Sequence, residues 1–131
     1  MECVIEGYMN PQNNSNFVDA IKNDSFDDVK CVFLKVLDME HINKLKNILK
    51  QWDKDDKLII PVYYCNEGGL LVKFVTKKII KNMSSNMLKI PRNEWFNKKY
   101  RAKFGIRKYA FKSNDNYING IRFDLKEFVL L

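Results

Sequence analysis

The residue types that most often carry catalysis or metal binding are scarce in this sequence of 131 residues. Its single histidine, His41, follows Glu40 in a stretch with helical spacing, where a solvated or capping role is favoured over that of a catalytic base. The three cysteines, Cys3, Cys31 and Cys65, are far apart and form no Cys-x-x-Cys pair, which argues against a zinc site and against disulfides. We therefore expect no catalytic residue, no metal site and no cofactor.

The motifs of nucleotide and nucleic-acid enzymes are also missing from the sequence. It contains neither a Gly-x-x-x-x-Gly-Lys loop nor a Gly-x-Gly-x-x-Gly loop to hold a phosphate. Asp53, Asp55 and Asp56 alternate with lysines in the manner of a solvated turn. Only Asp124, two residues before Lys126 on an expected strand, has the spacing of a magnesium-dependent nuclease, and it has no acidic partner. The prediction is that the protein is not an enzyme, with a small nuclease as the least favoured hypothesis.

The distribution of charge is the most informative feature of the chain. Its formal net charge is +7, yet residues 1–72 carry −4, residues 73–112 carry +12, and residues 113–131 carry −1. Such a concentration of positive charge repels itself and therefore indicates an anionic partner. The same basic stretch also contains aromatic rings, at Phe74, Trp95, Phe96, Tyr100, Phe104, Tyr109 and Phe111.

Periodicity predicts the elements that must position these residues. Strands are expected at residues 4–8, 29–37, 58–65, 70–79, 98–111 and 117–131. Apolar residues at spacings of three and four predict a helix over 39–52, with Asp38 as its N-cap, and one or two helical turns near Phe17. Residues 80–97 show no period and are expected to be irregular.

This order of elements does not alternate strand and helix, which disfavours a doubly wound sheet. It predicts a mainly β chain with one helix (α+β), arranged as a small, mostly antiparallel barrel. The length predicts a single domain over residues 1–131. No apolar run reaches 18 residues and the N-terminus does not resemble a secretion signal, so we expect an intracellular protein with no membrane partner.

Alternation in the strand at 98–111 separates two kinds of side chain. An apolar row, Tyr100, Ala102, Phe104 and Ile106, falls on one face, and a basic row falls on the other, followed by Tyr109 and Phe111. Single-stranded nucleic acid needs this composition, because cations bind phosphates and rings stack on bases. The expected phosphate contacts are Lys73, Lys77, Lys78, Arg101, Lys103, Arg107 and Lys108. The expected stacking residues are one or two of Trp95, Phe96, Tyr109 and Phe111.

Trp95 is the most specific of these candidates, because basic residues lie near it in the sequence. These residues, Arg92, Lys98 and Lys99, are also included in the expected site. The alternative role of Trp95 is a plug over one end of the barrel. A merely solvated basic face is the alternative for the surface as a whole.

The C-terminal third resembles the closing strands of OB-fold single-stranded-DNA-binding proteins of phages and large DNA viruses. The matching residues are Tyr100-Arg101-Ala102-Lys103-Phe104-Gly105-Ile106 and Asn119-Gly120-Ile121-Arg122-Phe123-Asp124-Leu125. The resemblance implies an OB-like barrel, binding of single-stranded DNA and a role in DNA replication. Such proteins often end in an acidic tail that recruits partners. This chain ends in Val129-Leu130-Leu131, so that role is not expected.

A different class of function competes with nucleic-acid binding. The chain could be a viral interaction module or inhibitor whose basic face docks on an acidic host protein. Rings among the lysines favour the nucleic acid, since a partner recognised by charge alone does not need them. The choice between DNA and RNA, a protein partner and homo-oligomerisation stay open, although Pro61 argues against pairing through the strand at 58–65.

Overall fold

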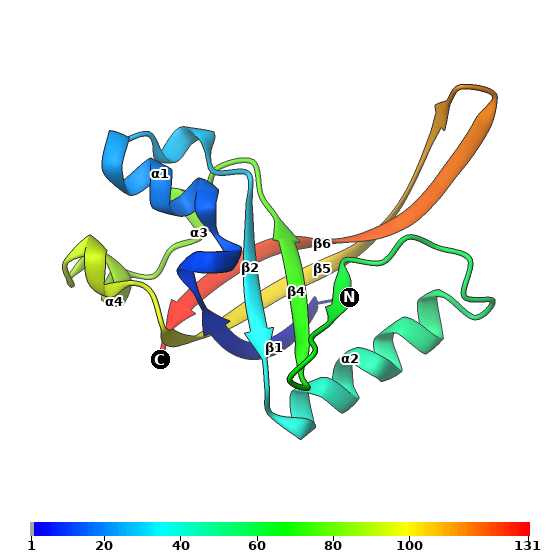
Figure 1. Cartoon of the computed structure of the whole chain (residues 1–131), viewed down its shortest axis with the longest axis horizontal. Helices are drawn as coiled ribbons and strands as arrows, with labels where there is room; N and C mark the ends of the chain where they lie inside the picture. Colours follow the sequence, from blue (N-terminus) through cyan, green and yellow to red (C-terminus); the bar gives the residue numbers. More distant parts are fainter. Residues whose placement is uncertain (1) are drawn as a thin grey trace.

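The computed structural model describes residues 2–131, in which strands predominate and four α-helices occur (Figure 1). The strands are β1 (Glu2–Met9), β2 (Cys31–Val36), β3 (Val62–Tyr64), β4 (Leu70–Val75), β5 (Lys98–Ser113) and β6 (Asn116–Leu130). The α-helices are α1 (Ser15–Asn23), α2 (Met39–Trp52), α3 (Ile79–Asn82) and α4 (Ser85–Leu88). The prediction of a mainly β chain is confirmed, whereas the prediction of one helix is wrong.

Five of the strands pair in a ring that closes on itself. β1 lies between β2 and β5, β6 lies between β5 and β4, and β2 also pairs with β4. These pairings are antiparallel except that of β4 with β6, which is parallel at Phe74–Phe123 and Val75–Asp124. β3 pairs with the first half of β4, on the edge that β6 takes further along. The ring therefore has an interior, which the core fills, and an exterior, on which a site can lie.

Alternation along the strands sends the apolar side chains into the ring. Phe74, Phe104 and Phe123 are fully buried, with ring centroids 5.1 Å apart for the first two and 4.6 Å apart for the last two. Tyr100 and Phe128 stack with centroids 4.5 Å apart and planes 2° from parallel. The expected apolar row of β5 thus lies inside, and its basic row faces outward.

The helix α2 begins and ends where the periodicity predicts. The carboxylate of Asp38 accepts a hydrogen bond of 2.9 Å from the backbone N–H of Glu40, so it caps the helix as expected. The apolar stripe of the helix is buried against the rest of the molecule at Ile42, Leu45 and Ile48.

Residues 80–97 are more ordered than the sequence predicts. They contain part of α3, the whole of α4 and a 3-10 turn at Arg92–Glu94. A helix of one turn spans too few residues to show a period, so the sequence pattern misses it. Burial of Ile79 and Met87 holds these turns against the core. No helix within residues 2–131 is long and apolar enough to cross a membrane.

The strand expected at 58–65 is interrupted in the structure. Pro61 has no N–H to donate, and regular pairing begins only at Val62. Before the proline, Ile59 makes a parallel bridge to Gly120 of β6. Its N–H donates to the carbonyl of Asn119 at 3.0 Å. Residues 59–64 therefore run beside β6 first and then beside β4.

The ends of β5 and β6 that meet at their turn form a two-stranded arm. The last pair between β1 and β5 is Glu2–Gly105, and beyond it the outer edge of β5 has no strand beside it within the described residues. The turn at Asn114 has a φ of 53°, a conformation that asparagine tolerates. Figure 1 shows this arm extending away from the helices.

Candidate nucleic-acid interface

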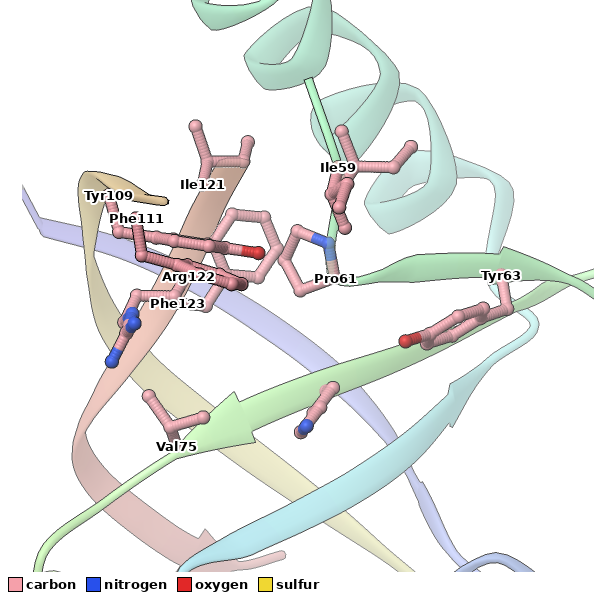
Figure 2. Close-up of a pocket in the computed structure, with 11 residues that line it drawn as sticks. Ile59, Pro61, Tyr63, Val75, Tyr109, Phe111, Ile121, Arg122 and Phe123 are labelled. Atoms are coloured by element: carbon pink, nitrogen blue, oxygen red, sulfur yellow. The ribbon is translucent and has the colours of Figure 1, made fainter. Parts of the chain in front are cut away.

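A cavity of about 370 Å³ opens at the base of the arm, on the outer face of the ring (Figure 2). We call it the ring groove. It is formed by the segment around Pro61, by β4, and by both strands of the arm. Its lining residues are Ile59, Ile60, Pro61, Tyr63, Lys73, Val75, Tyr109, Phe111, Ile121, Arg122 and Phe123.

Tyr109 and Phe111 form one wall of the ring groove. They are two residues apart on β5, so they share a face, and their ring planes are 10° from parallel with centroids 6.1 Å apart. Figure 2 shows both side chains extending toward Pro61. Half of the surface of Phe111 is exposed. These rings can offer flat apolar faces to a base.

Gly120 allows Tyr109 to take this position. It pairs with Tyr109 across the arm, and the ring of Tyr109 lies over its backbone. A Cβ atom at residue 120 would come within 2.4 Å of the tyrosine ring, closer than real contacts allow. The guanidinium of Arg122 lies 4.7 Å from the centroid of the same ring, within cation–π distance. The ring of Tyr109, which with Phe111 we call the stacking platform, is therefore held between the backbone of Gly120 and the guanidinium of Arg122.

Lys73 and Arg122 supply positive charge to the ring groove. Val72 and Phe74 point into the core, so Lys73 between them points outward. Within residues 2–131, neither Lys73 nor Arg122 lies within ion-pair distance of a carboxylate. The ring of Tyr63 lies across the groove and 6.5 Å from that of Phe33 on β2. Cations without a carboxylate partner thus lie among exposed rings.

A second cavity, of about 500 Å³, adjoins the ring groove at Val75, which lines both. We call it the basic pocket. It brings together the predicted residues Lys77, Lys78 and Arg107. The structure thus groups six predicted residues in two adjoining cavities, with Lys73, Tyr109 and Phe111 in the ring groove.

Of the four residues in the predicted basic row, Lys99, Arg101, Lys103 and Arg107, the first three line neither cavity. Lys99 and Arg101 are 3.6 Å and 3.4 Å from the carboxylate of Glu6, and Lys103 is 3.6 Å from that of Glu2. These three residues of the expected site therefore lie apart from Lys73. The reason is the strand order, since β6 separates β5 from β4, while β1 brings its carboxylates to the row.

Trp95 is a core residue, and the expectation that it stacks on a base is wrong. Its exposed fraction is 2%, and its indole N–H donates to the carbonyl of Met87 at 2.7 Å. Its ring packs against Phe17 and Phe26, with centroids 5.8 Å and 5.6 Å away. The hydroxyl of Tyr100 donates to its carbonyl at 2.7 Å, and burial raises the pKa of that hydroxyl. Phe96 is partly buried against the same cluster.

The remaining predicted residues are also outside the two cavities. Arg92 pairs with Asp24 at 2.7 Å and covers the ring of Phe26. Lys98 is exposed at the start of β5. Lys108 lies on the opposite face of the arm, 5.9 Å from the ring of Trp52.

No protein-family model matches the sequence, and no curated protein sequence matches it significantly. A solved structure does match. The chain resembles gp2.5 of bacteriophage T7, a single-stranded DNA binding protein. The likeness has a TM-score of 0.63 and covers 99% of this chain and 91% of gp2.5, at 12% sequence identity. At this identity the likeness to gp2.5 shows a shared fold. It supports the resemblance to phage proteins in part, and nothing extends that resemblance to large DNA viruses.

Tyr63 and Arg122 line the ring groove but were not among the predicted site residues. For Arg122 the sequence does contain a signal, because Ile121 and Phe123 on either side are buried and alternation turns Arg122 outward. For Tyr63 the signal is weaker, since Pro61 interrupts the strand and leaves only three paired residues to show a face. The position of both residues depends on β6 lying next to the segment around Pro61.

Proposed function

We propose that this chain binds single-stranded DNA without catalysis and with little sequence preference, and that its ring of strands is an OB-like barrel. One observation carries the proposal: two parallel rings, Tyr109 and Phe111, lie beside Lys73 and Arg122, which have no carboxylate partner in the described chain. The fold shared with gp2.5, whose name describes binding of single-stranded DNA, supports it. The closed pairing of β1, β2, β4, β6 and β5 supports the barrel.

In the proposed complex, unpaired bases stack on Tyr109 and Phe111, and the two cations contact the adjacent phosphates. Stacking contributes about 1–3 kcal/mol per base and accepts any base, because every base has a π-face. Phosphate contacts add affinity that falls with salt and carries no sequence information directly. Duplex DNA binds less well, because its bases are already stacked inside the helix.

The test is a fluorescence-anisotropy titration of the whole chain with labelled (dT)12 at three salt concentrations, repeated with a duplex of the same length and with U12. We expect tight binding to (dT)12 that weakens steeply with salt, and weaker binding to the duplex. Circular dichroism recorded on the same samples confirms that the chain is folded during the titration. Absence of binding at low salt would overturn the proposal and favour docking on an acidic protein. Preference for the duplex would overturn the single-strand assignment.

A further inference from the structure

The basic pocket differs in chemistry from the ring groove that it adjoins. Its lining contains five cationic side chains, one carboxylate and no aromatic ring. They belong to the segment between β4 and α3, to α3 and to the two long strands. The cationic side chains are those of Lys77, Lys78, Lys81, Arg107 and Lys126, and the carboxylate is that of Asp124. A site of this composition suits a phosphate and offers no platform to a base.

Most of the positive charge in the basic pocket is not compensated within the chain. The single carboxylate, Asp124, accepts from Arg107 at 3.1 Å and 3.3 Å, so these two charges oppose each other. The four lysines of the pocket have no carboxylate within ion-pair distance among residues 2–131. Like charges held together in this way repel, and an anion placed among them relieves that repulsion.

Asn82 holds two of the lysines near each other. Its side-chain N–H groups donate to the carbonyls of Leu125 and Lys126, at 3.4 Å and 3.1 Å. Its side-chain oxygen accepts from the hydroxyl of Thr76. These bonds join the end of β4 and α3 to β6, so Lys81 of α3 and Lys126 of β6 line the same pocket. The lysines belong to a fixed backbone arrangement, although they come from distant parts of the sequence.

The two cavities are neighbours on the surface. Val75 lines both, and Phe123 of the ring groove directly precedes Asp124 of the basic pocket. Across the arm, Arg107 of the basic pocket pairs with Arg122 of the ring groove. A strand leaving the groove along this edge therefore enters the pocket without crossing the neutralised row, which is Lys99, Arg101 and Lys103 with the carboxylates of Glu6 and Glu2.

We infer that the basic pocket binds backbone phosphates of the same single strand whose bases lie in the ring groove. This inference rests on the proposed function and makes the site bipartite, with a stacking part and a separate phosphate part. A short oligonucleotide fills the stacking part alone, whereas a longer one reaches both. Lys81 and Lys126, which lie in the pocket and were not predicted, then become contacts for the longer ligand.

The test compares (dT)4 with (dT)12, two lengths that both fall within the range of site sizes of single OB folds. In the double variant Lys81→Gln with Lys126→Gln, we expect about tenfold weaker binding of (dT)12, a salt slope lower by about 1.4, and a change below about twofold for (dT)4. The control is Lys22→Gln with Lys50→Gln, which removes the same charge from the exposed surface of α1 and α2. Circular dichroism confirms that all variants fold.

The outcomes separate the inference from the proposed function. If the unaltered chain binds neither oligonucleotide, the proposed function fails and the inference fails with it. If the chain binds both but the pocket variant weakens them equally, or weakens neither, the inference alone is overturned. An equal loss in the control variant would also overturn it, because the lysines would then act only through net charge.

Discussion

The two halves of β5 look alike in sequence and differ in surroundings. In the first half, Lys99, Arg101 and Lys103 face outward and lie against carboxylates of β1. In the second half, β1 has ended, and Tyr109 and Phe111 line a cavity whose cations are unpaired within the described residues. The comparison teaches that basic residues on a strand are available to a ligand only where the neighbouring strand brings no acids. The order of the strands and the point at which β1 ends decide which residues are available.

The largest loss of affinity should come from removing the two aromatic rings in the second half of β5. For Tyr109→Leu with Phe111→Leu, we expect (dT)12 affinity to fall about a hundredfold, because stacking contributes roughly 1–3 kcal/mol per base. The salt slope should not change, since no charge is lost. Anisotropy titrations measure both. The control is Tyr117→Leu, an exposed ring on the other face of the same arm, which should alter affinity by less than about twofold. Equal losses in the two variants would contradict the placement of the groove.

The platform can also be disturbed without changing a ring. Gly120→Ala places a Cβ against Tyr109, so the ring must move, and we expect about tenfold weaker binding. In a double-mutant cycle with Tyr109→Ala, the alanine at 120 should cause no further loss, because the ring that it displaces is already gone. Additive losses would show that Gly120 acts by another route.

Removing two positive charges from the ring groove, or two from the first half of β5, compares the contributions of these two surfaces to binding. Lys73→Gln with Arg122→Gln should weaken (dT)12 binding about fivefold and lower the salt slope by about 1.4. Arg101→Gln with Lys103→Gln removes the same charge from the neutralised row and should cost less than about twofold. Titrations at several salt concentrations give affinity and slope together. The opposite ranking would place the strand over β1 and the first half of β5.

The smallest change in affinity should come from removing the carboxylate that neutralises Lys99 and Arg101. Glu6→Gln removes the carboxylate beside Lys99 and Arg101, so we expect affinity at low salt to rise by about two- to threefold. The gain should disappear at higher salt, because it arises from charges at long range. Glu94→Gln, an exposed residue of the 3-10 turn, is the matched control. A fall in affinity would mean that Glu6 supports the fold of the site.

Local patterns predicted much of the fold because they report on neighbours in sequence. The helix at 39–52 carries four turns of apolar spacing and an N-cap, so its bounds were predicted without error. The apolar row of β5 followed from alternation alone. The single turns α3 and α4 left no such pattern, since the contacts that hold them come from other parts of the chain.

The candidate site was predicted in part for the same reason. Tyr109 and Phe111 were found because they alternate on one strand, and Lys73 because of its charge. Trp95 was misassigned because its basic neighbours in sequence say nothing of Phe17 and Phe26, which surround it in space. Only the strand order, with β6 beside β4, brings the ring groove together.

The closure of the ring also sets an order of events for a chain leaving the ribosome. Paired residues of β2 and β4 are about forty residues apart in sequence, whereas those of β1 and β5 are about a hundred residues apart. The pairing of β1 with β5 therefore forms later during synthesis. Until then β1 has an open edge, and the inner face of the half-formed sheet exposes Ile5, Val32 and Phe74. A fragment that ends before Lys98 should therefore be prone to aggregation and should not fold as a smaller protein. Pairing of β5 with β1 and of β6 with β4 closes the ring and buries these apolar side chains.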